Sequence, residues 1–291
     1  MSVLCLVANP DDQELSRQIV AAIHGETGGE INWLAQSIAC EIVSPRAENA
    51  LEIAREIIAE KAVDAVLVPK KGRRKKLLIA DMDSTMINEE CIDELADRLG
   101  LREKISQITA KAMRGEIDFN QALATRVKLL KGLARKTLEQ VRREQITLAP
   151  GGSVLVQTMK AHGACTALVS GGFSFFAEHF AKRIGFDEAL ANVLEFDDAD
   201  TLTGTVTPPI VNSSTKVKRL DELAKQENIS LFQTLAVGDG ANDLAMLNHA
   251  GMGVALHAKP QIAANAPFRI DHGDLSALLY MQGYSEEEFV R

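Results

Sequence analysis

The stretch Leu77-Leu78-Ile79-Ala80-Asp81-Met82-Asp83-Ser84-Thr85 decides the fold of this 291-residue chain. Its first four residues are apolar without alternation, which is typical of a parallel strand covered on both faces. Two carboxylates, Asp81 and Asp83, follow directly. Side chains two positions apart in an extended chain point the same way, so both carboxylates can reach one site. One could act as a nucleophile and the other as a general acid and base, with a metal ion screening their repulsion.

Three further apolar runs have the same character and lie at 165–170, 235–238 and 253–256. Helical patterns at 152–161, 175–184 and 217–226 separate them. The alternation of strands and helices predicts a doubly wound, Rossmann-like parallel α/β sheet. In such a sheet the active site lies beyond the carboxyl ends of the strands.

The first 70 residues have a different pattern. Apolar runs at 3–8, 31–34, 37–43 and 65–68 predict strands, and helical spacing occurs at 15–23 and 46–61. The order βαββαβ predicts a small ferredoxin-like α+β domain. We therefore expect this domain at 1–70, a basic linker at 71–76, a core made of 77–86 and 149–291, and a helical cap at 87–148. An insertion after the first core strand can fold over the strand ends as a lid.

Composition and charge exclude several classes of protein. The net charge is −8 and aromatic residues make up 4% of the chain, which argues against nonspecific nucleic-acid binding and against a base-stacking surface. The run KKGRRKK at 70–76 fits either a basic binding patch or a solvated linker, and the acidic whole favours the linker. The four cysteines lack metal-binding spacing. No signal peptide or apolar run of about 18–20 residues is present, so we expect a cytoplasmic protein without a membrane partner.

Three more segments near predicted strand ends carry candidate chemistry. Ser170-Gly171-Gly172 offers a hydroxyl and backbone amides to phosphate oxygens. Lys216 opens a predicted helix and can neutralise a phosphate as a point charge. Gly238-Asp239-Gly240-Ala241-Asn242-Asp243 is acidic and glycine-rich, which suits a hard cation with oxygen ligands. Each segment alone is compatible with a turn or a surface residue, whereas their joint order is specific.

In chain order these segments read DMDST, VSGG, TK and GDGAND. This order resembles that of the haloacid dehalogenase-like phosphatases, whose signature is DxDxT, then Ser or Thr, then Lys, then GDxxxD. The resemblance covers Lys75 to about Leu279. Within that superfamily the stretches DMDSTMINEE, GEIDFNQALATRVKLLKGL, LVSGGF and AVGDGANDLAML resemble the phosphoserine phosphatases.

The resemblance implies roles for individual residues. Asp81 matches the nucleophile that forms an aspartyl-phosphate, and Asp83 matches the general acid and base. The implied Mg²⁺ ligands are Asp81, the main-chain carbonyl of Asp83 and Asp239, with Asp243 in support. The phosphate and its surroundings are matched by Ser170, Gly171, Lys216 and Asn242. Glu90 matches the residue for the substrate ammonium, Arg126 the residue for its carboxylate, and Phe119 the apolar wall over it.

The resemblance implies Mg²⁺-dependent hydrolysis of O-phospho-L-serine, the last step of serine biosynthesis. Phosphotransfer to another hydroxyl amino acid, or action on another small phosphomonoester, remains an alternative, because the acceptor that enters the closed cap decides it. A serine-sensing protein without catalysis is disfavoured because the catalytic residues are intact. Residues 1–70 resemble ACT-type domains, which implies a homodimer and a serine site in that domain; a purely structural appendage is the alternative.

Overall fold

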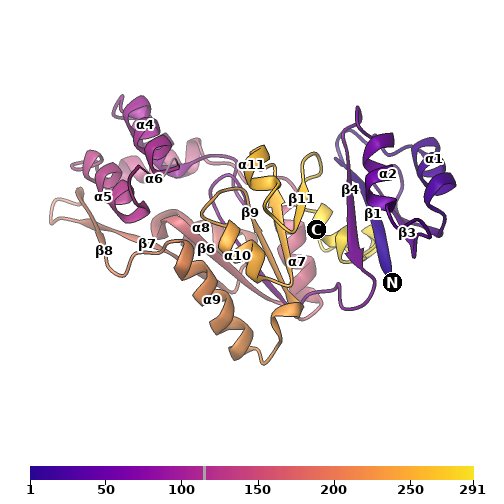
Figure 1. Ribbon diagram of the computed structural model, residues 1–291. Coiled ribbons are helices and arrows are strands. Elements are labelled where there is room, and N and C mark those ends of the chain that lie inside the picture. Colours follow the sequence, from indigo (N-terminus) through magenta and orange to yellow (C-terminus); the bar gives the residue numbers. More distant parts are fainter. Residues whose placement is uncertain (114–115) are drawn as a thin grey trace.

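The protein consists of two β-sheets with their helices and a helical segment on one side (Figure 1). The structure, a computed structural model, describes residues 1–113 and 116–291. Predicted cap residues 114 and 115 lie outside the described residues. Among the described residues no helix is long and apolar enough to cross a membrane.

The N-terminal unit has the predicted order βαββαβ. It comprises β1 (Ser2–Ala8), α1 (Arg17–Thr27), β2 (Glu30–Ala35), β3 (Ala39–Val43), α2 (Ala50–Ile57) and β4 (Val63–Pro69). The strands pair antiparallel in the order β2-β3-β1-β4, as expected for a ferredoxin-like unit. One sheet face, including Leu4 and Ile42, packs in the cluster that also contains buried residues of α1 and α2.

The opposite face of this small sheet, including Val3 and Val66, belongs to the hydrophobic cluster of the large unit. Its neighbour there is α12 (Ala277–Met281), close to the C-terminus in Figure 1. Alternating side chains of β1 therefore serve two cores, which explains why its run is apolar without interruption. The two ends of the chain are thus packed together.

The large sheet confirms the predicted parallel α/β class. Its order is β11-β10-β9-β5-β6-β7-β8, with all neighbours parallel except the antiparallel pair β7–β8. Its elements are β5 (Leu77–Ala80), α7 (Gly152–Ala161), β6 (Cys165–Phe173), α8 (Ser174–Ile184), β7 (Glu188–Phe196), β8 (Leu202–Thr207), α9 (Ser213–Gln226), β9 (Thr234–Gly238), α10 (Leu244–His249), β10 (Met252–Leu256), α11 (Pro260–Ala263) and β11 (Phe268–Ile270).

Two features of this sheet differ from the expectation. Strand β6 does not end at Ser170 but continues to Phe173, and its register against β7 shifts between Val169 and Phe173. Ser170 and the two glycines therefore lie on an irregular strand end, not in a separate loop. Strands β7, β8 and β11 were not predicted, because β8 is rich in threonine and β11 has only three residues.

The helical segment after β5 consists of α3 (Cys91–Asp97), α4 (Arg102–Met113), α5 (Phe119–Leu129) and α6 (Arg135–Glu144). Its base is closed by a bridge between Ile87 and Leu148. Its far side contacts the hairpin β7–β8, where the Gly132 amide donates to the Leu202 carbonyl at 2.8 Å. The segment is therefore attached to the core at both ends. The boundaries predicted for the domains and the cap stay a prediction.

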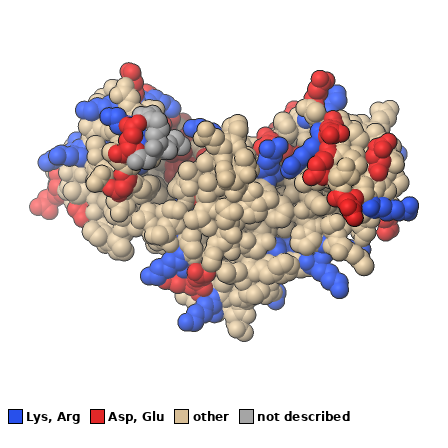
Figure 2. Space-filling model, in the orientation of Figure 1, with Lys and Arg blue, Asp and Glu red and all other residues tan. Residues whose placement is uncertain are grey.

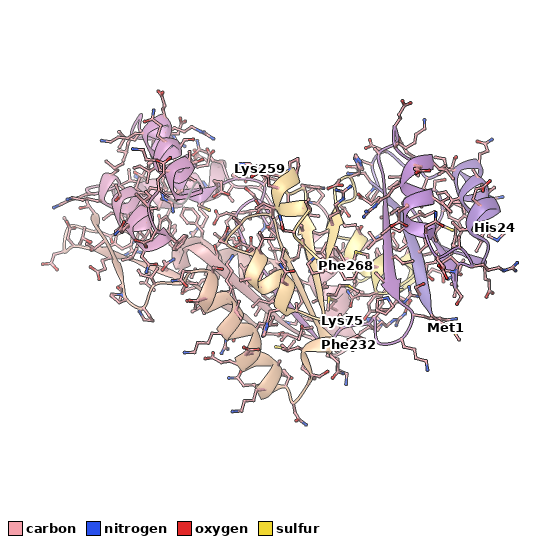
Figure 3. All side chains as sticks on the ribbon, viewed as in Figure 1. Met1, His24, Lys75, Phe232, Lys259 and Phe268 are labelled. Atoms are coloured by element: carbon pink, nitrogen blue, oxygen red, sulfur yellow. The ribbon has the colours of Figure 1, made fainter. Side chains whose placement is uncertain are left out.

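The basic run is not fully solvated, contrary to the expectation for it. The side chain of Lys75 is buried, and its Nζ donates to the Phe232 carbonyl at 2.7 Å and lies 4.4 Å from the Phe232 ring centroid (Figure 3). Arg73 forms an ion pair with the buried Glu41 of β3. These contacts connect the linker to both units, because Lys75 binds Phe232 of the core and Arg73 binds Glu41 of the N-terminal unit.

Candidate active site

The site lies at the carboxyl ends of three neighbouring strands. Strand β5 pairs with β9 on one side and β6 on the other, so the residues that follow or end these strands share one edge. Asp81 follows β5, Asp239 follows β9, and Ser170 lies near the end of β6. The backbone amide of Asp81 donates to the Val237 carbonyl at 3.0 Å, which extends the pairing into the site.

Three carboxylates form a compact group at this edge. One oxygen from each of Asp81, Asp239 and Asp243 lies within 4.8 Å of the others. The hydroxyl of Thr85 donates to Asp239 at 3.0 Å. Burial and the charge of Asp81 raise the pKa of Asp239 to about 6. The carboxylates of this group therefore repel one another, and a cation between them would relieve that repulsion.

Lys216 provides one positive charge inside the acidic group. It lies in the first turn of α9, where the side chain of Asn212 caps the helix by accepting from the amides of Ser214 and Thr215. Its Nζ lies 2.7 Å from Asp81 Oδ1 and 2.6 Å from Asp243 Oδ1, and the side chain is fully buried. Burial lowers the pKa of Lys216, but the carboxylates of Asp243 and Asp81 raise it more, to above the ordinary value for lysine.

Asp83 is held on the other side of the site. Its Oδ1 accepts from the Cys91 amide at 2.8 Å, and its Oδ2 accepts from the Ser170 hydroxyl at 3.3 Å. A Cβ at Gly172 would collide with the Asp83 carboxylate, so only glycine permits this close approach. Burial, together with the charge of Asp81, raises the pKa of Asp83 to about 6. A carboxyl with this pKa can hold and release a proton near neutral pH.

The cap brings two charged side chains towards this acid pair. Glu90 precedes α3 and accepts a hydrogen bond from the Ser84 hydroxyl at 2.9 Å. Desolvation and the charge of Asp83 raise the pKa of Glu90 to about 8. Desolvation lowers the pKa of Arg126, on α5, whereas the charges of Glu90, Asp93 and Asp83 raise it. Arg126 therefore lies within electrostatic range of Glu90 and Asp83.

Helix α5 also supplies an aromatic ring. Phe119 is its first residue, seven positions before Arg126, so both lie on the same side of the helix. The Phe119 ring approaches Gly171, where a Cβ would come within 3.1 Å of Phe119 Cζ. Asn242 completes the set, with its amide nitrogen 3.4 Å from Asp81 Oδ2. The structure thus brings every candidate residue to one region.

Several contacts at the site had no assigned role at the level of sequence. Thr109 of α4 accepts a hydrogen bond from Arg126 at 3.2 Å and itself donates to the Ile105 carbonyl. Asn120 of α5 accepts a hydrogen bond from Asn212, the residue that caps α9, at 3.4 Å, so the cap contacts the core near Lys216. Thr85 was part of the DxDxT motif, whereas Thr109 and Asn120 had no signal in a single sequence.

The acidic group fits a divalent cation. Asp81, Asp239 and Asp243 carry three negative charges when ionised, and Lys216 offsets one of them, which leaves two. Carboxylate oxygens are the ligands that Mg²⁺ prefers in proteins. Asp243 also belongs to this group, and its two oxygens are engaged by Lys216 Nζ at 2.6 Å and by the Gly240 amide at 3.0 Å.

A parallel sheet that presents a pair of aspartates, a buried lysine and an acidic group at one edge defines an enzyme equipped for phosphoryl transfer. Residues 78–248 match the family model of the haloacid dehalogenase-like hydrolases. The match covers more than half of the chain, and the chain belongs to this family.

The similar proteins include phosphoserine phosphatases. A probable phosphoserine phosphatase from Schizosaccharomyces pombe is 40% identical over 83% of this chain and 82% of its own length. A HAD family hydrolase from Salmonella enterica serovar Typhi has a TM-score of 0.84 and 31% identity, over 97% of this chain and 98% of its own. A substrate-bound phosphoserine phosphatase structure has a TM-score of 0.66 and 38% identity, over 71% of this chain and 97% of its own. The chain spans 52% to 64% of three other curated phosphoserine phosphatases.

Proposed function

We propose that this enzyme hydrolyses O-phospho-L-serine to L-serine and phosphate through an aspartyl-phosphate on Asp81. The observation that carries the proposal is that two cap residues come to the same site: Glu90, which accepts from Ser84 beside the acid pair, and Arg126, whose pKa is raised by the charges of Glu90 and Asp83. A free amino acid phosphate has a carboxylate, an ammonium and a phosphate, and the site offers a group for each. Phosphoserine phosphatases at 40% to 45% identity support the same substrate.

The first chemical step forms a bond between Asp81 and phosphorus. Asp81 Oδ1 is engaged by Lys216 and by the Met82 amide, which leaves Oδ2 as the freer oxygen for attack. As the new bond forms, the bond from phosphorus to the serine oxygen breaks, and protonated Asp83 donates its proton to that oxygen. Ser170, Gly171 and Lys216 hold the phosphoryl oxygens, and Asn242 lies beside the attacking oxygen.

The second step reverses the role of Asp83. The ionised carboxylate takes a proton from water, and the resulting oxygen attacks phosphorus and releases Asp81 with free phosphate. The pKa of Asp83, raised to about 6, suits both directions of transfer. Mg²⁺ would be held by Asp81, Asp239 and the Asp83 carbonyl, with Asp243 in support, and when bound it neutralises charge on the phosphoryl oxygens.

Recognition of the amino acid depends on the cap. Arg126 takes the substrate carboxylate, Glu90 takes the ammonium, and Phe119 covers the apolar part. The Thr109 hydroxyl donates its only proton to the Ile105 carbonyl, so towards Arg126 it can act only as an acceptor. This hydrogen bond fixes the direction of the Arg126 guanidinium.

The test is phosphate release from a panel of phosphomonoesters with D- and L-phosphoserine included. Asp81→Asn removes the nucleophile, and we expect loss of release from every substrate. Arg126→Ala and Glu90→Ala should lower kcat/KM for phosphoserine by about tenfold or more, and much less for p-nitrophenyl phosphate, which has neither an ammonium nor a carboxylate. Lys128→Ala on the exposed face of α5 is the matched control. Normal release by Asp81→Asn would contradict the proposal.

Counting released phosphate against phosphorylated acceptor separates hydrolysis from phosphotransfer to another hydroxyl amino acid. We also propose four properties that accompany this function. They are the domain limits stated above, a cytoplasmic location, a homodimer and a serine site in residues 1–70. The buried, unpaired cysteines Cys5, Cys40 and Cys91 support a reducing compartment. Because one face of the small sheet packs on the core, pairing between copies would use the α1–α2 side or the edge strand β2.

A further inference from the structure

A cavity of about 140 Å³ lies between the N-terminal unit and the core, and none of the active-site residues lines it. Residues from α2, β4 and the segment between them form one wall, and β11 with the loop after it forms the other. Figure 2 shows Lys and Arg side chains beside the hollow between these parts. The charged lining residues are Arg55, Lys61, Asp64, Arg269, Asp271 and His272.

The carboxylates of this cavity are already engaged. Asp64 is buried and accepts from the backbone amides of Asp271, His272 and Gly273 at 2.8, 3.1 and 2.7 Å. Asp271 pairs with Arg269 at 3.1 Å. Within the described part of the chain, the side chains of Arg55 and Lys61 have neither an ion pair nor a hydrogen bond. Two exposed cationic side chains of the cavity, Arg55 and Lys61, are therefore left by the described residues without an ion pair or a hydrogen bond.

Two of the cations line the cavity from opposite sides of the junction. Arg55 is near the end of α2 and Arg269 lies in β11. Desolvation and the positive charge of Arg269 lower the pKa of Arg55, although Asp271, Glu52 and Asp64 act in the opposite direction. The two guanidinium groups line one cavity and repel each other, whereas an anion bound between them would be attracted to both.

The wall on the core side is fixed before any ligand arrives. The three amides that donate to Asp64 hold the loop 271–273 against β4. The His257 ring lies within hydrogen-bond distance of the Gly273 carbonyl, at 2.8 Å. A preformed wall lowers the entropic cost of binding, because the protein groups need not be ordered when the ligand binds.

We propose that this cavity is a binding site for a small oxyanion, either inorganic phosphate or a small carboxylate, which bridges Arg55 and Arg269 and joins the N-terminal unit to the core. Its volume suits such an ion and is well below the roughly 300–1,000 Å³ of sites for larger ligands. The site is separate from the catalytic residues, so the proposal does not depend on the proposed function.

The test compares thermal unfolding and calorimetric binding of the full chain with Arg55→Gln. Phosphate and acetate are titrated separately, against sodium chloride of equal ionic strength. At saturating anion we expect the unfolding midpoint of the wild type to rise by about 2 °C or more. With phosphate, Arg55→Gln should bind one ion fewer per chain, and it should lose the rise that belongs to this site. Its midpoint in chloride should equal or exceed that of the wild type, because the repulsion from Arg269 is gone.

The matched control is Arg17→Gln, which removes an exposed arginine of α1 outside the cavity. This variant should keep the full response, whereas Arg269→Gln should lose it as Arg55→Gln does. A response to phosphate alone identifies a phosphate site, and a response to acetate as well identifies a general oxyanion site. An equal rise in the wild type and in Arg55→Gln, or no anion-specific rise in the wild type, would overturn the proposal. Activity on phosphoserine is not used as a readout, so failure here leaves the proposed function untouched.

Discussion

Lys216 shows how one residue governs the charge of the site. It is fully buried, and its ammonium touches Asp81 and Asp243 at once. A buried charge is tolerated only when it is paired and hydrogen-bonded, and each of these three groups depends on the others for that. The same residue thus makes the acidic group stable without metal and leaves it with enough negative charge to attract one.

We expect Lys216→Met to lose phosphatase activity and to reduce the free energy of unfolding at pH 7 by about 3–5 kcal/mol, because two buried carboxylates lose their partner. Urea denaturation in EDTA measures the stability, and phosphate release measures the activity. Lys218→Met removes a lysine two positions away whose side chain is 77% exposed, and its effect should stay within about 0.5 kcal/mol. Equal stability of the two variants would contradict the role assigned to Lys216.

At the residue scale, short motifs predicted which residues of the core would lie together. Asp81, Asp83 and Asp239 lie at strand ends, and a strand end places its residues from local sequence alone. The residues that contact the cap residues could not be predicted from local sequence. Thr109 meets Arg126 only because α4 and α5 pack together, and threonine at a helical position carries no signal of that contact.

At the element scale, the hairpin β7–β8 supports the cap. Besides the Gly132 contact, the Leu202 amide donates to the Leu133 carbonyl at 2.9 Å, and Arg135 pairs with Asp200 at 2.6 Å. The apolar, continuous strands β5, β6, β9 and β10 were predictable from their composition. The hairpin β7–β8 was not predictable, because β8 has a polar sequence pattern instead of an apolar run. Its residues Thr203, Thr205 and Thr207 form hydrogen bonds to Glu195.

At Gly204 the hairpin lies close to the end of α5. Its φ is +88°, and a Cβ there would lie 3.0 Å from Lys131 Cβ and 3.3 Å from the Lys128 Cα. We expect Gly204→Val to push the cap away and lower kcat/KM for phosphoserine by about tenfold or more, since small displacements of positioning groups are costly. The effect on p-nitrophenyl phosphate should be smaller, because that substrate does not need Arg126.

The control for this variant is Gly163→Val, which imposes similar backbone strain without a collision. Gly163 has a φ of +80° and nothing within 4 Å of its Cβ position. Both variants should lose stability from the strain, and only Gly204→Val should change the preference between the two substrates. The same loss of preference in Gly163→Val would mean that strain, not cap displacement, is the cause.

On the scale of the whole molecule, the net charge of −8 does not describe the site. The acidic residues of the active centre lie together, whereas the cavity at the N-terminal junction is lined by Arg55 and Lys61, which form no ion pair with the described residues. The βαββαβ order of the first unit was predictable from sequence. Its junction with the core was not, because β1 and α12 stand at opposite ends of the chain and their contact is purely tertiary.

The buried acids make the stability of the whole protein depend on pH and metal together. The pKa values of Asp83 and Asp239 are raised to about 6, and that of Asp243 is raised as well, above those of an unfolded chain. Between about pH 4 and 7 the folded state therefore binds more protons than the unfolded state, so these groups reduce stability as pH rises through that window. Above about pH 7 these carboxylates are ionised in both states, and their destabilising effect on the folded protein no longer increases.

We therefore expect Mg²⁺ to raise the unfolding midpoint more at pH 8 than at pH 5, because at pH 8 the metal meets ionised carboxylates and at pH 5 it competes with protons. Scanning calorimetry in EDTA and in excess Mg²⁺ at both values measures this difference. Asp239→Asn removes one acid of the group, so it should flatten the pH dependence in EDTA and lose most of the response to Mg²⁺. A response to Mg²⁺ that is equal at both pH values, or larger at pH 5, would show that the metal does not bind at this acidic group.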